Sequence, residues 1–175
     1  MKTLVLYGHS SPEQSFSNAT IVAELAKLPD VKVRTLAEHR INGHFDVAAE
    51  QKELVEADRI VFQFPFNWYS LPWLLKQWVD EVLTYGFAYG EGGDKLKGKP
   101  VILSFTTGVP AEGYVNPTTD ALLLPVKQTL ALTQIKLEES ESSNGMMYIP
   151  GFAGDKDEVK SKALAHAQRL AARLK

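Results

Sequence analysis

The chain of 175 residues contains no cysteine, which excludes disulfide bonds, thiol catalysis and cysteine-ligated metals. Its charges are balanced, with 19 Lys and Arg against 21 Asp and Glu, so no broad basic surface points to a nucleic acid partner. No apolar run approaches the roughly 20 residues that span a bilayer, and no apolar signal segment precedes the first apolar run. We therefore predict a soluble, cytoplasmic protein.

The signature motifs of several enzyme classes are also missing. There is no GxxxxGK[ST] loop for nucleoside triphosphate hydrolysis and no GxSxG elbow for a serine hydrolase. No HExxH motif is present, and His39 and His44 stand five apart on a predicted loop, so we expect no metal site. Asp80 and Glu81 are predicted to lie on a helix surface rather than to form an acid–base pair.

Apolar patterning predicts strands that alternate with helices. Residues 3–7 are a continuous apolar run, which is typical of a central parallel strand covered on both faces, and residues 60–64 and 101–105 are predicted as two further buried strands. The shorter patterns at 31–36 and 135–137 give a second and a fifth strand. Residues 39–45 and 109–117 are predicted loops, and Ser70 is predicted to cap the helix after the third strand. Apolar residues recur at helical spacing at 21–25, 47–55, 71–82, 122–130 and 155–174.

This alternation predicts an α/β fold with a parallel sheet and right-handed crossovers in a single domain over residues 1–175. The strand order 2-1-3-4-5 would give a five-stranded flavodoxin-like three-layer sandwich with helices on both faces. In that arrangement the loops after the first, third and fourth strands meet at the carboxyl edge of the sheet. They are residues 9–18, 65–70 and 106–114, the most unusual stretches of the sequence, and we expect the functional site there.

The first loop has the composition of an anion site. Ser15 and Ser17 offer hydroxyls, and backbone amides enter a helix near Asn18, which suits a terminal phosphate. One of these polar residues would equally serve as a helix cap, so the loop alone leaves both interpretations open. His9 adds a further polar group, which favours the phosphate.

The other two loops suit a flat ligand. Trp68 and Tyr69 in the second loop can cover an aromatic cofactor, although they could equally belong to the core or to a subunit interface. The third loop, residues 106–108, offers small hydroxyl side chains and amides that a ring can approach. Thr-Gly turns are common, so this loop indicates a ligand site only in combination with the other two loops.

The first two thirds of the chain carry a series of short motifs. In order they are Asp46–Gln51, Ala57-Asp58, Phe62–Pro72, Leu75-Lys76, Gly86–Tyr89 and Thr106–Gly108. Together they resemble the NAD(P)H:quinone oxidoreductase family over most of residues 3–114. The short length and the stretch from Tyr89 to Gly93 are most similar to the bacterial branch, which includes ancillary oxidoreductases of glutathione-regulated potassium efflux systems.

The resemblance implies a flavodoxin-like fold, a homodimer with active sites at the subunit boundary, and a flavin. It implies FMN rather than FAD, because the chain lacks the C-terminal extension of the longer relatives, with NADH or NADPH as donor. It gives catalytic positions to Tyr114 near the flavin and to Tyr89, which with Phe87 would reach the acceptor pocket from the partner subunit. By motif, the cofactor-binding residues are His9, Ser15, Phe16, Ser17 and Asn18 at the phosphate, Pro65, Phe66, Asn67, Trp68 and Tyr69 along the ring, and Thr106, Thr107 and Gly108 at its polar edge.

The expected reaction is a ping-pong transfer of two electrons from NAD(P)H through the flavin to a quinone or similar acceptor. Three alternatives stay open. The first is a reductase of azo or nitro compounds. The second is a regulatory subunit held at the inner face of the membrane by a potassium-efflux protein. The third is a flavodoxin-type electron carrier that needs a separate reductase.

Overall fold

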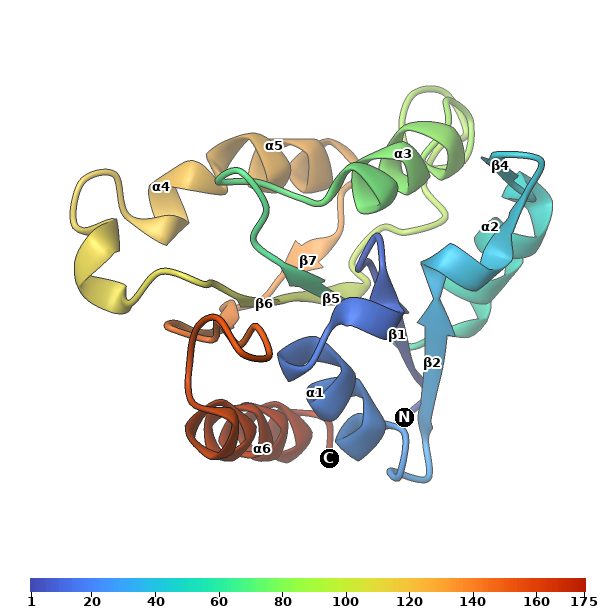
Figure 1. Cartoon of the computed structure of the whole chain (residues 1–175). Coiled ribbons are helices and arrows are strands. Elements are labelled where there is room, and N and C mark those ends of the chain that lie inside the picture. Colours follow the sequence, from blue (N-terminus) through green and yellow to red (C-terminus); the bar gives the residue numbers. More distant parts are fainter.

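A computed structural model describes all 175 residues and contains one central parallel sheet (Figure 1). Its strands follow the order β2-β1-β5-β6-β7, which is the predicted order 2-1-3-4-5. Each neighbouring pair is parallel, as crossover connections through helices require. These strands are β1 (Thr3–Tyr7), β2 (Val31–Thr35), β5 (Arg59–Pro65), β6 (Pro100–Thr106) and β7 (Lys136–Leu137).

The fifth position of the sheet is divided between two short strands. The amino end of β6 pairs with β7, whereas its carboxyl end pairs with β8 (Glu141–Ser143). Only one fifth strand was predicted, because β8 contains no apolar residue. The division matters for function, since β8 leads a fourth segment to the carboxyl edge of the sheet.

Helices cover both faces of the sheet and make the predicted three layers (Figure 1). On one face, α2, α3 and α5 pack over a large core that includes the fully buried Trp78. On the other face, α1 and α6 pack over a smaller core around Val61 and Ile102. The helices are α1 (Ser17–Leu25), α2 (Val47–Glu56), α3 (Trp73–Val82), α4 (Thr119–Leu122), α5 (Leu124–Leu132) and α6 (Lys156–Arg173).

Several local predictions differ from the structure. Residues 39–45 are not only loop, because β3 (Arg40–Ile41) and β4 (His44–Phe45) form a small antiparallel pair. The Glu81 carboxylate, expected on the helix surface, is half-buried and accepts a hydrogen bond from the Phe45 amide at 2.8 Å. Ser70 does not cap α3, since Pro72 precedes the first turn and Ser70 belongs to a separate turn.

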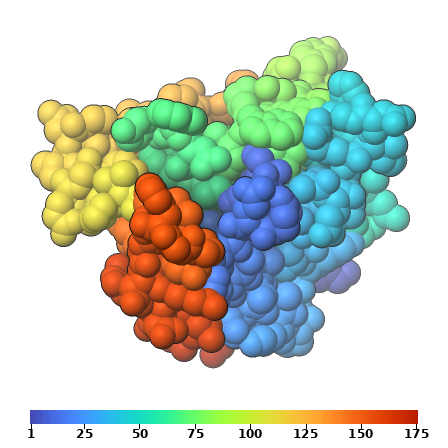
Figure 2. Space-filling view, in the orientation of Figure 1, coloured from blue at the N-terminus to red at the C-terminus, as the bar shows by residue number.

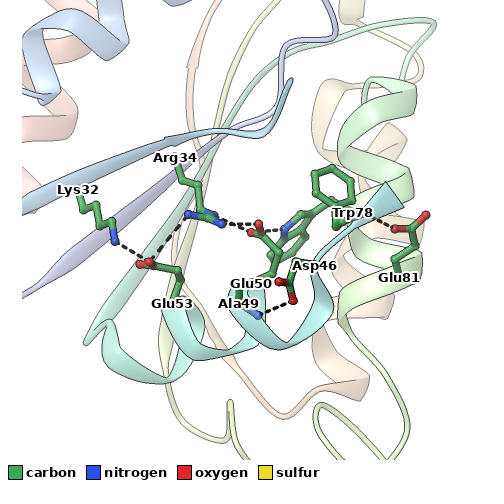
Figure 3. Close-up of polar contacts among 9 residues, drawn as sticks. Lys32, Arg34, Asp46, Ala49, Glu50, Glu53, Trp78 and Glu81 are labelled. Atoms are coloured by element: carbon green, nitrogen blue, oxygen red, sulfur yellow. Dashed lines mark hydrogen bonds and ion pairs between the residues drawn. The ribbon is translucent and has the colours of Figure 1, made fainter. Parts of the chain in front are cut away.

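A buried ion pair joins β2, α2 and α3 (Figure 3). Arg34 Nε and Nη2 donate to the two carboxylate oxygens of Glu50 at 2.8 and 2.6 Å, and Trp78 Nε1 donates to Glu50 at 3.0 Å. Every donor that reaches this carboxylate is therefore supplied by another element of the fold, which is what a buried charge requires.

No helix in the structure combines the length and apolarity needed to cross a membrane.

Candidate functional site

The loops after β1, β5 and β6, together with the segment after β8, line one cleft of about 410 Å³. In Figure 2 the blue segment after β1, the green segment after β5 and the orange segment after β8 meet on the face toward the viewer. Another hollow, of about 340 Å³, lies at the opposite edge beside Lys2 and Asp30, where parallel sheets rarely bind ligands. The predicted residues that line the cleft are His9, Ser15, Phe16, Ser17, Asn18, Pro65, Phe66, Asn67, Thr106, Thr107 and Gly108.

The first turn of α1 opens into this cleft without a side-chain cap. Phe16 occupies the cap position, and none of the neighbouring serine or asparagine side chains bonds to the turn. The backbone amides of Ser17 and Asn18 have no acceptor within the chain, although both residues are buried. Capping, the simpler explanation of the polar residues, is therefore excluded. Buried free amides at a helix N-terminus are suited to an anion.

His9 lies beside this turn as a neutral hydrogen-bond donor. The Ser11 amide donates to His9 Nδ1 at 3.0 Å, so the proton of the neutral ring is on Nε2. Burial lowers the pKa of His9, against a smaller opposing effect of the Glu13 carboxylate. The ring lines the cleft and offers an N–H group there without a fixed positive charge.

Asn18 links the first and third loops through its side chain. Its Nδ2 donates to Thr106 Oγ1 at 2.8 Å, and its Oδ1 accepts from Gln63 Nε2 at 2.9 Å. All three residues are buried at the end of the α1 layer. Thr106 Oγ1 accepts from Asn18 and donates to nothing within the chain, so its proton is available to a ligand in the cleft.

The rest of the third loop is held by the segment after β8. The Thr107 hydroxyl lies 2.7 Å from the Val109 carbonyl oxygen and 2.8 Å from Asn144 Oδ1, so its proton is used internally. At Gly108 an added Cβ would approach Met147 Cε at 3.2 Å, which is tighter than ordinary contact. Only a small residue at 108 lets the two segments lie this close.

The second loop ends in a strained turn that faces outward. Asn67 and Ser70 exchange two backbone hydrogen bonds of 3.0 Å, and Trp68 and Tyr69 between them have φ of 47° and 64°. Left-handed backbone is unfavourable for residues with bulky side chains. Trp68 is 93% exposed, and neither aromatic residue lines the cleft within one chain. Strain retained at such a position is typical of functional sites.

The two predicted catalytic tyrosines lie in different places. Tyr114 packs edge-on against Phe66 and Tyr69, with ring centroids 6.1 and 6.5 Å apart, at the rim of the cleft. Tyr89 instead packs edge-on against Tyr85 at 5.9 Å, in the connection after α3. The chain thus brings Tyr114, but not Tyr89, to the rim formed by its own loops.

Residues 146–149 form a fourth wall that the sequence did not predict. They follow β8, whose carboxyl end lies at the same edge of the sheet as the other loops. Met147, Tyr148 and Ile149 are a short apolar stretch between two glycines, Gly145 and Gly151. This apolar stretch inside a glycine-flanked loop was the sequence feature that could have predicted the fourth wall. Gln14 is the other lining residue that was not predicted.

The family model described as flavodoxin-like fold matches residues 1–173. The chain belongs to this family. Among curated relatives, it is 42% identical over 158 residues to "Uncharacterized NAD(P)H oxidoreductase YdeQ" of Bacillus subtilis, covering 87% of this chain and 75% of that protein. It is 35% identical over 178 residues to "Glutathione-regulated potassium-efflux system ancillary protein KefF" of Salmonella newport, covering 97% and 95%. The chain is thus a flavodoxin-like member of the NAD(P)H oxidoreductases.

Two solved structures of this family are similar along almost their whole length. General stress protein 14 of Treponema denticola, solved in complex with FMN, has a TM-score of 0.86 and 32% identity, with 98% of this chain and 99% of that chain covered. An NADPH-quinone reductase from P. pentosaceus has a TM-score of 0.78 and 26% identity, with 97% of each chain covered.

Proposed function

We propose that this protein is an FMN-dependent NAD(P)H oxidoreductase that passes two electrons to a quinone or a similar acceptor. The observation that carries the proposal is the uncapped first turn of α1, which opens into a cleft walled by the three loops of the switch point. A cleft of about 410 Å³ is within the usual range for a cofactor site. The FMN-bound relative from T. denticola and the oxidoreductase relatives support the same assignment.

The α1 end of the cleft fits a phosphate monoester. The free amides of Ser17 and Asn18 would donate to it, with the Ser15 hydroxyl and the His9 ring on either side. Because these donors are buried, hydrogen bonds to an anion there would be stronger than in water. A neutral sugar hydroxyl could also accept from these amides, but its hydrogen bonds would be weaker than those of a charged phosphate.

The opposite end of the cleft fits a flat ring. Pro65, Phe66 and Asn67 would lie along it, and the Thr106 hydroxyl with the Gly108 amide would meet its polar edge, since the Thr107 amide already donates to the Ser143 carbonyl. When bound, FMN supplies the hydride-accepting and two-electron-donating chemistry that the side chains lack. The protein contributes position, exclusion of water and donors where negative charge develops.

The exposed aromatic rim favours a homodimer whose site is completed by the second copy. Trp68, Tyr69, Trp73 and Tyr85 are all exposed in the single chain, which is expensive for large aromatic side chains. We expect Tyr89 and Phe87 to reach the acceptor pocket from the partner, because Tyr89 lies away from the cleft of its own chain.

The test is to purify the protein, identify any released flavin, and follow its anaerobic bleaching by NADH and by NADPH. We expect FMN, bleached rapidly by at least one nicotinamide and reoxidised by a quinone. A protein that carries no flavin and binds none when it is added would contradict the proposal. Flavin that bleaches only through a separate reductase would point to an electron carrier. Preferential reoxidation by azo or nitro compounds would make these compounds, rather than a quinone, the electron acceptor.

A second candidate is an ancillary role at a membrane potassium-efflux protein. It rests on the identity to KefF over nearly the whole of both chains. If it holds, the tagged protein will co-purify with an efflux protein from solubilised membranes of its source cells. Recovery of the protein alone from those membranes would contradict it.

A further inference from the structure

A continuous line of buried hydrogen bonds leads from the cleft into the α6 layer. Beyond Asn18 and Thr106, it passes through Gln63 on β5 to Ser104 on β6, whose hydroxyl lies 2.6 Å from Gln63 Oε1. Gln63 and Ser104 are register partners and both are fully buried. Neither of them lines the cleft, so neither can touch a ligand there.

The line continues through a buried histidine to an arginine at the surface. His166 on α6 lies 2.8 Å from Ser104 Oγ through Nε2 and 3.0 Å from Ser143 Oγ through Nδ1. Arg169 Nη2 donates to the same Ser143 hydroxyl at 3.0 Å, while its Nε donates to Glu141 at 2.8 Å. His166 is buried completely, whereas about half of the Arg169 side chain is exposed.

The Gln63 side-chain carbonyl gives this line a single direction. Its Oε1 can only accept, so Ser104 donates its one proton to Gln63 and must accept from His166 Nε2, which leaves His166 Nδ1 to accept from Ser143. Burial, and after it the charge of Arg169, lowers the pKa of His166 to about 4, so the ring is neutral at pH 7 and carries its proton on Nε2.

The same logic passes from the histidine to the cleft. Ser104 accepts from His166 and donates to Gln63 Oε1, and the Gln63 amide then donates to Asn18 Oδ1. Asn18 donates to Thr106 Oγ1, which is left with a proton and no acceptor in the chain. Reversing any one link would set two donors or two acceptors against each other.

We propose that this line is a positioning relay, in which Ser143, His166, Ser104 and Gln63 orient Asn18 and hold the Thr106 hydroxyl as a donor toward the cofactor. The inference rests on the proposed function, since it takes FMN as the occupant of the cleft. It assigns a role in cofactor binding to residues that never contact the cofactor.

The experiment compares Ser104→Ala with Thr133→Val in the full-length protein. Both variants remove one buried, hydrogen-bonded hydroxyl, but Thr133 bonds only to the Leu130 carbonyl and lies outside the relay and the cleft. FMN affinity is measured by fluorescence titration, with thermal unfolding of each apoprotein as the check on structure. We expect Ser104→Ala to bind FMN roughly tenfold more weakly than the wild type, and Thr133→Val to bind it as the wild type does.

A second readout does not depend on the cofactor. Nitrogen-15 NMR of the histidine rings, assigned by replacing His9, His39 and His44 in turn, should show His166 protonated on Nε2 at pH 7. Protonation on Nδ1 would overturn the relay, because it reverses every donor from Ser104 onward.

The remaining outcomes separate this inference from the proposed function. If the wild type binds FMN and Ser104→Ala binds it equally well, the relay is wrong and the function stands. If the wild type binds no FMN, both fall. Should Ser104→Ala fail to fold, Ser143→Ala, which removes a partly buried hydroxyl at the other end of the relay, gives the same test, and unchanged FMN affinity there would overturn the relay.

Discussion

The two faces of the central sheet are made by the same strands but hold different chemistry. On the α3 side, Phe62 packs edge-on against Trp78 with ring centroids 5.8 Å apart, and Phe64 stacks on Phe105 at 5.7 Å. On the α1 and α6 side, the neighbouring residues Gln63 and Ser104 carry a polar line to the cleft. One face supplies stability through apolar burial and the buried Arg34–Glu50 ion pair, and the other gives up apolar burial to arrange donors at a site.

The largest effect should come from breaking the ion pair on the stabilising face. Glu50→Ala would leave the nearly buried Arg34 with only the more distant carboxylate of Glu53, 3.8 Å from Nη1, and we expect it to lower the free energy of unfolding by about 3 kcal/mol. Urea denaturation measures this loss. The matched control is Asp80→Asn, which breaks the exposed pair with Lys76 and should cost less than about 1 kcal/mol.

If the two faces are as separate as we infer, folded Glu50→Ala will still bind FMN with the affinity of the wild type. A large loss of FMN affinity in the folded variant would show that the ion pair also shapes the cleft, and the comparison between the faces would fail.

On the polar face, the contribution of His166 to the free energy of unfolding should depend on pH. The pKa of His166 is about 4 in the native state and about 6.5 in the unfolded chain, so below pH 6.5 the unfolded state binds the proton that the native state does not. Its contribution to stability is complete above pH 6.5 and is lost as the pH falls toward 4. Between pH 7.5 and pH 5 we expect a loss of about 2 kcal/mol.

Urea unfolding of the wild type and of His166→Gln at both pH values isolates this contribution, because glutamine does not titrate. The charged groups on the packed elements, Arg169 on α6 and Glu141 on β8, remain in both proteins. Equal pH dependence in the two proteins would mean that native His166 binds its proton as readily as the unfolded chain does, so that burial does not lower its pKa.

The rim of the cleft should show the smallest effect and the opposite sign. Replacing Trp68-Tyr69 by Asn-Gly supplies the two residues that accept left-handed backbone best in a tight turn. Because Trp68 is almost fully exposed, little packing is lost, and we expect the double variant to gain about 1 kcal/mol in thermal or urea unfolding. Oxidoreductase activity should fall at the same time, since the aromatic rim is gone.

A double variant that is less stable than the wild type would show that the turn is relaxed in the native state. One that is more stable and fully active would remove Trp68 and Tyr69 from the proposed site. The second result would restrict the functional region to the cleft itself.

Most of the fold and of the cleft follows from the sequence because the three central strands, β1, β5 and β6, are largely apolar. Parallel topology then forces the loops after β1, β5 and β6 to one edge, which brings His9, Asn18 and Thr106 together without further information. These elements are specified locally, and local patterns reveal them.

The features that escaped prediction are specified by tertiary contacts. The strand β8 is entirely polar, so only its pairing with β6 makes it a strand. His166 occupies the inward face of α6, where its two serine partners come from distant strands. The outward turn at Trp68 and Tyr69 opposes the backbone preference of both residues, and no local pattern predicts a conformation that the residues themselves disfavour.

The proposed function depends most on the free amides of α1 as a phosphate site. The direct measurement is the affinity of the apoprotein for FMN and for riboflavin, which share the ring and differ in the phosphate. Charge-assisted hydrogen bonds from buried donors should make FMN bind roughly a hundredfold more tightly than riboflavin. Equal affinity for the two, or no binding of either, would contradict the assignment of the cleft.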